Sequence, residues 1–443
     1  MRTLTEYESE VFEVQPARQH EISAAADHLK GRVQLRWLAG DRVEVTATQW
    51  VGSVDVPGVG PLRVVPKLAG NELDVLAMMA FAEGSSHDVL ASLKHLHSPG
   101  KSDSMPEMLA RFLTDSANDV HRQGLLAGYR PAEDDLPYIR GRLNFREQAL
   151  RKFGVLDTLA CDYEEFDTDI LENRVVAAAL GVAHRFTSTP QLRSMTARAH
   201  EDFFGSASTP PPSPEFARRT LQYDRRNERY RTVLTWSLAV LENSFLDNIF
   251  NVGQARAQAF LVDMNSLFER FVTTLVRESL PAGLVTLPQT NDSTVFRSDS
   301  DGFAIRPDIS ISDGFRSCSI DAKYKRYDEH SLSPGDLYQL TTYAQAYPGW
   351  GSVPRSMLIY PSMGSATPRT IQFRPGGRLL AEIHVHPLPI RGIIAALSGG
   401  DSSPLDTFKQ ALHRWLGTNG DSATDDKVAA RHRPASQTHL GTP

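Results

Sequence analysis

The sequence has few cysteines and no long apolar segment, and both absences limit what the protein can be. Cys161 and Cys318 are the only cysteines among 443 residues, they lie far apart, and neither belongs to a metal-ligand spacing. Cysteines used so sparingly are typical of a reducing compartment, so we expect a cytoplasmic protein. No apolar run approaches the roughly 20 residues of a membrane-spanning helix, and the N-terminus lacks the apolar stretch of a signal peptide. We therefore expect no membrane partner.

Histidine spacing and net charge exclude two further classes of protein. The 14 histidines form no HExxH motif and no Cys/His cluster, so a zinc site is not expected. His87, His95 and His97 fall in a stretch rich in Ser, Gly and Asp that we interpret as an exposed loop. The formal net charge of −6 argues against broad, nonspecific coating of DNA. It remains compatible with a local basic groove, or with delivery to DNA by a partner.

Length and periodicity predict an α+β protein of several domains, because 443 residues exceed one hydrophobic core. We expect a β-rich domain at residues 1–125, a mostly helical middle region at 126–250, and an α/β domain with a mixed central sheet flanked by helices at 251–416. Residues 417–443 lack an apolar stripe and are expected to be disordered. The Pro-rich piece Ser206–Pro214 is expected to join helices. The predicted strands are Arg32–Leu38, Arg42–Thr48, Leu62–Leu68, Ser356–Tyr360, Thr370–Phe373 and Glu382–Pro387. The predicted helices are Leu73–Ala82, Pro106–Leu126, Glu215–Asn243 (one helix or a pair) and Leu405–Leu416.

Several polar residues of the middle region have two possible roles. Arg140, Arg142 and Arg174 could form ion pairs within the protein, or they could present guanidinium groups to phosphate or to a partner. Asn173 is unfavourable in the middle of a predicted helix, so its side chain should form a hydrogen bond. The arginine-rich stretch Glu215–Asn243 is either a solvated face or a contact to the nucleic-acid backbone.

The pattern that points most directly to chemistry lies between residues 305 and 347. Two apolar-alternating runs, Phe303–Ser312 and Phe315–Tyr324, predict a hairpin of two strands. Because side chains alternate along a strand, Asp321 and Lys323 share one face, and Asp308 near the end of the partner strand can reach the same point. Two carboxylates and an amine at one point are the minimum apparatus for Mg²⁺-assisted hydrolysis of a phosphodiester.

The neighbouring elements decide how Asp321-Ala322-Lys323 is interpreted, since a lone Asp-Xaa-Lys is more often a solvated strand edge. A predicted helix at Pro334–Tyr347 follows the hairpin and carries Gln339. Another predicted helix, Asp263–Leu280, precedes the hairpin and carries Glu269 among apolar residues. This order of helix, strand hairpin and helix resembles the core of the PD-(D/E)xK nucleases.

This interpretation gives each candidate site residue a role. Asp308, Asp321 and the backbone carbonyl of Ala322 would bind Mg²⁺, and Glu269 would complete the ligand shell directly or through water. Lys323 would orient or deprotonate the attacking water, since a nearby dication should lower the pKa of its ammonium group. Gln339 would orient the water or a neighbouring backbone group; packing against the hairpin is an equally open role for it.

Over residues 30–390 the sequence also resembles the McrC family, the nuclease subunits of McrBC-type modification-dependent restriction systems. The resemblance is carried by Pro66-Lys67, Gly124-Leu125-Leu126, Arg140-Gly141-Arg142, Asn173-Arg174, Asp263-Met264-Asn265, Phe268-Glu269, Pro307-Asp308, Asp321-Ala322-Lys323-Tyr324-Lys325, and Asp336 with Tyr338-Gln339-Leu340 and Tyr343-Ala344. It implies an N-terminal half, including the domain at 1–125, that docks onto an McrB-like AAA+ GTPase ring and stimulates GTP hydrolysis. It further implies a C-terminal PD-(D/E)xK endonuclease that cuts modified, foreign double-stranded DNA with Mg²⁺. This chain contains no GxxxxGK[ST] loop, so the GTPase would be another protein.

Two other functions remain open at this point. The chain could be an adaptor that assembles and activates an AAA+ ring without cutting DNA. It could also be a Mg²⁺-dependent nuclease that acts alone. Retention of Glu269, Asp308, Asp321 and Lys323 together argues against a decayed nuclease centre.

Overall fold

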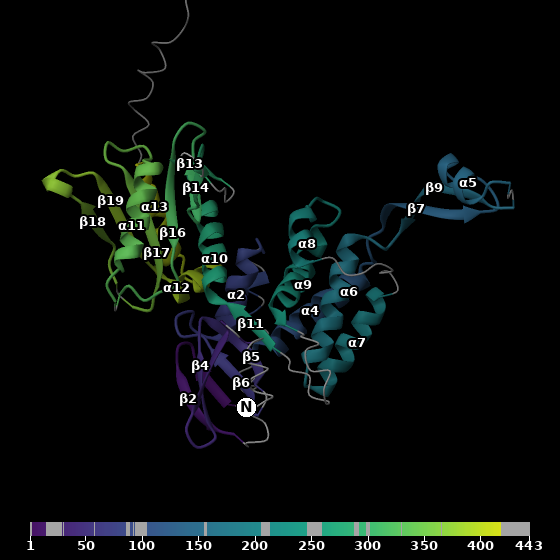
Figure 1. The fold of residues 1–443 in the computed structure, drawn as a ribbon, viewed down its shortest axis with the longest axis horizontal. Helices are drawn as coiled ribbons and strands as arrows, with labels where there is room; N and C mark the ends of the chain where they lie inside the picture. The colour runs from purple at the N-terminus through teal and green to yellow at the C-terminus, as the bar shows by residue number, and fades with distance from the viewer. Residues whose placement is uncertain are drawn as a thin grey trace, which may run out of the picture. The chain divides into compact units, whose positions relative to one another are not determined.

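The protein has an α+β fold whose residues pack into two compact units (Figure 1). The first unit comprises Met1–Phe271 and Ile390–Gly400, and the second comprises Val272–Pro389 and Asp401–Pro443. The computed structural model describes residues 2–14, 29, 31–56, 58–85, 89–91, 93, 104–154, 157–204, 213–245, 259–287, 292–297, 302–328, 330–364 and 366–417. The three histidines of the predicted loop, most of the Pro-rich piece and residues 418–443 of the predicted disordered tail lie outside these residues. The three-domain division proposed above stays a prediction.

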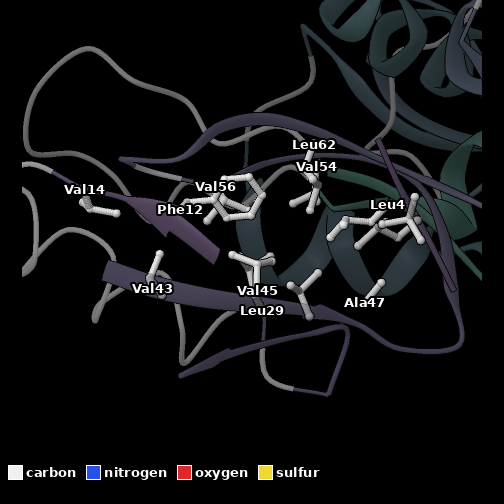
Figure 2. Close-up of a cluster of buried hydrophobic side chains, with 13 residues drawn as sticks. Leu4, Phe12, Val14, Leu29, Val43, Val45, Ala47, Val54, Val56 and Leu62 are labelled. Carbon is white, nitrogen blue, oxygen red and sulfur yellow. The ribbon is translucent and has the colours of Figure 1, made fainter. Parts of the chain in front are cut away.

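Two sheets share a hydrophobic core at the start of the first unit. Valines that alternate along the strands, such as Val43, Val45, Val54 and Val56, are buried in this core (Figure 2). The predicted strand Leu62–Leu68 ends early, at Val65, because Pro66 has no N–H to donate to the ladder. The five-stranded sheet has the order β1 (Arg2–Thr5), β6 (Gly60–Val65), β5 (Trp50–Val56), β11 (Ala259–Asp263) and β10 (Ser244–Phe245), and the three-stranded sheet has the order β2 (Ser9–Glu13), β4 (Arg42–Ala47) and β3 (Val33–Leu38).

A group of helices makes up most of the remaining first unit. Its members are α2 (Glu72–Ala82), α4 (Met105–Arg122), α6 (Leu171–Phe186), α7 (Pro190–Phe204), α8 (Pro214–Thr220), α9 (Arg231–Asn243) and α12 (Ile390–Leu397). The stretch predicted as one helix or a pair is therefore a pair, α8 and α9, with the short 3-10 helix η2 (Glu228–Tyr230) between them. Arg218 of α8 lies 2.5 Å from both Glu83 and Glu242, so this arginine holds helices together.

Asn173 forms the hydrogen bonds that its place in a helix demands. Its amide donates to the carbonyl oxygens of Leu126 and Thr168, at 2.9 and 2.7 Å. Its side-chain oxygen accepts from the Tyr230 hydroxyl at 2.8 Å, and that hydroxyl in turn accepts from the Leu126 N–H. The prediction of a hydrogen-bonded asparagine is confirmed, and the role of this residue is structural.

Residues 128–167 form an arm, which is a long hairpin within the region predicted to be mostly helical (Figure 1). Its strands β7 (Gly128–Leu136) and β9 (Leu159–Asp167) pair antiparallel along their whole length, and β8 (Arg142–Leu143) pairs with β9. The short helix α5 (Phe145–Arg151) follows β8. Gly141 is required before β8: its φ is +71°, and a Cβ there would come within 2.3 Å of the Asp162 carbonyl oxygen.

The second unit is built on a mixed six-stranded sheet with helices on both faces. The strand order is β12 (Val285–Leu287), β15 (Ile309–Ser312), β16 (Ser317–Ala322), β17 (Arg355–Ser362), β19 (Ala381–Pro389) and β18 (Arg369–Phe373). Helix α11 (Pro334–Ala346) packs on one face, where its Leu340 meets Ile383 and Val385 of β19. The alternate residues His384 and His386 contact Trp415 and Phe408 of α13 (Ser403–Leu416), which therefore lies on the other face.

One predicted strand is wrong in the second unit. The run Phe303–Ser312 contains two strands, since β14 (Gly302–Ile305) pairs with β13 (Asp292–Arg297) in a separate hairpin and only β15 joins the central sheet. The break falls at Arg306-Pro307, because Pro307 has no N–H for the ladder and restricts the residue before it. The predicted helix Asp263–Leu280 is observed as α10 (Met264–Ser279), which begins in the first unit and ends in the second.

Glu107 caps a neighbouring helix, which gives the fold a pH-dependent contact. Its Oε1 accepts from the backbone N–H and the hydroxyl of both Ser188 and Thr189, just before α7 begins. Burial alone would raise the pKa of Glu107, but these hydrogen bonds outweigh it and lower the pKa below 4.5. A carboxyl whose pKa is lower in the folded state stabilises the fold above its unfolded pKa, and this stabilisation is lost as the pH falls through the folded pKa.

The substitution Glu107→Gln should therefore lower the free energy of unfolding by about 1 kcal/mol at neutral pH, a typical value for a lost cap. The difference from the unsubstituted protein should shrink below the folded-state pKa. Urea titrations at neutral pH and at a pH below the folded-state pKa of Glu107 measure the free energy of unfolding of both proteins. Glu215→Gln is the matched control, because Glu215 is exposed in the first turn of α8 and lies 3.8 Å from Arg219. An equal loss of stability in both variants would contradict the capping role.

Candidate active site

The hairpin of β15 and β16 places two carboxylates opposite each other. Ile309 pairs with Ile320 in an antiparallel register, so Asp308 and Asp321 stand one step farther along on the same face. The Asp308 side chain is fixed there, because its Oδ2 accepts a hydrogen bond from the Ala322 N–H at 2.8 Å. The break at Pro307 ends the preceding strand just before Asp308, which frees this side chain to turn toward β16.

Asp321 is the most unusual residue of the site because its charge is buried. Its exposed fraction is 1%, and it lies beside Leu358 of β17, on the face that α11 covers. Neither of its carboxylate oxygens has a hydrogen-bond partner among the described residues. The ammonium nitrogen of Lys323 lies 3.1 Å from Oδ2 as an ion pair. Burying a carboxylate with so few partners costs several kcal/mol, so the fold maintains this group at the expense of stability.

Lys323 stands at the point where β16 leaves the sheet. Its backbone N–H still donates to the Ile359 carbonyl oxygen of β17 at 3.0 Å, and its side chain is half-buried. Burial alone would lower the pKa of the Lys323 ammonium, but the nearby carboxylates, that of Asp321 first, raise it above its usual value. Lys323 is therefore protonated at neutral pH in this structure.

Gln339 reaches the site through Tyr343, a residue to which the sequence analysis gave no role in the site. The Gln339 amide donates to the Tyr343 hydroxyl at 2.9 Å, and this hydroxyl donates to the Arg306 carbonyl oxygen at 2.8 Å. The pair thus holds the backbone two residues before Asp308. The spacing of i and i+4 on one helix was the signal for Tyr343 in the sequence.

The predicted site residues are distributed over both units. Asp308, Asp321 and Lys323 meet in the second unit, and Glu269 is a half-buried residue in the part of α10 that belongs to the first unit. The role of Glu269 and that of the Ala322 carbonyl stay predictions. Within the described ranges, no three His, Cys, Asp or Glu side chains are grouped so that they could hold a metal ion.

The arginines of the middle region form ion pairs within the protein. Arg174 lies 2.5 Å from Asp169, and Arg142 lies 3.5 Å from Asp162. Arg140 lies over the ring of Tyr163 with its guanidinium carbon 4.0 Å from the ring centroid. For Arg174, which is half-buried, the structural role predicted as one of two alternatives accounts for the contacts.

Comparison with known proteins identifies the family. The family model described as "McrBC 5-methylcytosine restriction system component" matches residues 45–361, well over half of the chain. This chain belongs to the McrBC family. No curated protein matches it significantly in sequence. No helix among the described residues is long and apolar enough to cross a membrane.

Solved structures of McrBC assemblies resemble this McrBC-family chain. One is described as a refined half-complex from a tetradecameric assembly of Thermococcus gammatolerans McrB AAA+ hexamers with bound McrC; its TM-score is 0.57 at 18% identity, and the match covers 93% of this chain and 99% of that one. At this identity the likeness shows a shared fold. A cryo-EM structure of the Thermococcus gammatolerans McrBC complex matches with a TM-score of 0.42 at 20% identity, covering 63% of this chain and 88% of that one.

Proposed function

We propose that this McrBC-family chain is the Mg²⁺-dependent endonuclease subunit of a GTPase-driven restriction complex that cuts modified DNA. The observation that supports the proposal most directly is the buried carboxylate of Asp321 beside Lys323 and opposite Asp308. A fold under selection for stability alone would not keep such a group, whereas a site for phosphate chemistry uses it. The PD-(D/E)xK resemblance assigns the same residues to the same chemistry.

The donor set fits a magnesium ion. Among the described residues the Lys323 ammonium, 3.1 Å from Oδ2, is the one positively charged group placed at Asp321, which leaves carboxylate oxygen capacity for a cation, and hard cations prefer carboxylate oxygens. Asp308 and Asp321 would hold the ion together with the Ala322 carbonyl, and Glu269 would be the further ligand. When bound, Mg²⁺ supplies positive charge that favours deprotonation of an attacking water and stabilises the charge that builds up on the phosphate.

The chain's own residues perform the positioning. The Ala322 N–H holds the Asp308 carboxylate in place, and the Tyr343 hydroxyl holds the backbone that leads to it. Lys323 presents its ammonium group at Asp321, where it can donate to the water or to a phosphate oxygen. Preorganised groups of this kind need no rearrangement during the reaction, which is how such sites lower the barrier.

The partner in this proposal is an McrB-like AAA+ GTPase ring, which docks on the first unit. Support comes from the fold shared with an McrC that is bound to McrB hexamers, and from the surface of the arm. Phe145, Leu150 and Phe153 of the arm are 76%, 71% and 90% exposed. Large apolar side chains gathered on one element of a soluble protein mark an interaction surface.

The test is DNA cleavage by the reconstituted complex. With the partner ring, GTP and Mg²⁺ present, DNA that contains 5-methylcytosine should be cut, and EDTA should abolish cutting. Stimulated GTP hydrolysis without any cleavage would favour the adaptor instead. Cleavage by the isolated chain without partner or nucleotide would favour the nuclease that acts alone.

A further inference from the structure

The backbone hydrogen bonds that join β16 to the sheet end at Lys323. The last ladder bond of this strand is the one from the Lys323 N–H to Ile359. The next residues follow two tight bends, in which the N–H groups of Lys325 and Tyr327 donate to the carbonyl oxygens two residues earlier, at 2.9 and 3.2 Å. Such short-range bonds do not fix the segment against the rest of the unit, so side-chain contacts must determine its direction.

Asp336 is the residue on which those side chains converge. It lies in the first turn of α11, is 8% exposed, and accepts from the hydroxyl groups of Tyr327 and Ser333, each at 2.7 Å. The ammonium group of Lys325 lies 3.5 Å from its Oδ1. The N-terminus of a helix favours a carboxylate at this position, and the three donors offset the cost of burying its charge. Asp336 thereby joins the bends after β16 to the start of α11.

Tyr327 makes this joint rigid from its other side. Its ring is buried in the apolar cluster between α11 and the sheet, edge-on to Tyr360 with 5.7 Å between the ring centroids. A ring held in that way has one direction for its hydroxyl, which is toward Asp336. The bends between Lys323 and Tyr327 are therefore tied at their far end.

We infer that Asp336 is a positioning residue that, through Tyr327 and Lys325, holds the turn after β16 so that the Lys323 ammonium stays at Asp321. The inference rests on the proposed function for its effect on catalysis, but the geometry it describes exists in the isolated chain. Groups that orient residues of a metal site in this way typically change activity by about 10–100-fold when they are removed.

The first experiment follows the side chain of Lys323 without any nuclease assay. The full-length protein is labelled by reductive dimethylation, and mass spectrometry measures the extent of labelling at Lys323 relative to the exposed Lys67. In Asp336→Ala, labelling at Lys323 should rise, because the turn relaxes and the ammonium leaves Asp321. Asp336→Asn keeps an acceptor for the two hydroxyl groups and should label at nearly the normal rate. Unchanged labelling of Lys323 in Asp336→Ala would overturn the inference.

The second experiment measures cleavage by the reconstituted complex. Asp336→Ala should lower kcat by about 10–100-fold with little change in KM or in partner GTPase stimulation. Asp336→Asn should restore most of the rate, which a general loss of folding would not allow. If the alanine variant does not fold, Tyr327→Phe replaces it, because this substitution keeps the ring and removes one hydrogen bond to Asp336. Labelling of Lys323 should rise and kcat should fall, as in Asp336→Ala. No change in either quantity would refute the role of Asp336.

The matched control is Asp406→Ala. Asp406 also lies in the first turn of a helix of this unit, α13, and accepts from the Ser402 hydroxyl at 2.8 Å. This variant should leave both Lys323 labelling and kcat unchanged, and a shift equal to that of Asp336→Ala would refute the assignment. Absence of cleavage by the unsubstituted complex would count against the proposed function alone, since the labelling result stands without it.

Discussion

Replacing Asp321 by asparagine is expected to lower the rate of DNA cleavage by the complex by about a thousandfold, because charge stabilisation around a phosphoryl group contributes several kcal/mol. Asparagine has the same shape, but it carries no charge to hold a cation or to pair with Lys323. The buried carboxylate has few partners, so its loss should not lower the melting temperature. Stimulation of the partner GTPase should stay normal, because Asp321 lies in the second unit.

Asp313→Asn provides the same chemical change in the turn of the same hairpin. Asp313 is exposed; its Oδ2 accepts from the Trp350 Nε1–H at 2.6 Å, and its Oδ1 accepts from two backbone N–H groups. An asparagine oxygen can keep the two backbone hydrogen bonds at Oδ1, whereas the bond from Trp350 is lost. Cleavage by this variant should be normal. Equal cleavage rates for Asp321→Asn and the unsubstituted chain would refute the proposed site.

A double substitution in the arm, Phe145→Ser with Phe153→Ser, is expected to weaken binding to the partner ring by more than about thirtyfold. An aromatic anchor that becomes buried in an interface contributes about 2 kcal/mol or more, which corresponds to this factor. Both side chains are exposed in the isolated chain, so its melting temperature should not change. The measurement is the concentration of the chain that gives half-maximal stimulation of GTP hydrolysis.

Phe315→Ser is the control for this experiment. Phe315 is 96% exposed at the turn between β15 and β16 in the second unit, so it is an equally accessible phenylalanine outside the arm. Its replacement should leave the half-maximal concentration unaltered. An arm variant that stimulates GTP hydrolysis at the same concentration as the unsubstituted chain would show that the partner binds elsewhere.

The elements that could be predicted are those whose pattern is local. Strand β4 and helix α2 follow from an alternating and a helical spacing of apolar residues, and both are observed close to their predicted bounds. The break at Pro307 was also visible in the sequence, but the apolar alternation on both sides of it suggested one strand where there are two. Whether such a run forms one strand or two depends on the strands with which it pairs, and a partner strand that is distant in the sequence gives no signal in the local residue pattern.

Sequence by itself determined which residues of the proposed site could meet. Because side chains alternate on a strand, Asp321 and Lys323 had to share a face, and a tight turn had to bring Asp308 alongside them. The tertiary structure alone decided that Asp321 is buried, that Gln339 donates a hydrogen bond to the Tyr343 hydroxyl, and that Asp336 ties the turn after β16 to α11. These features depend on how a helix packs over a sheet, and contacts between residues distant in sequence are set by that packing rather than by local spacing.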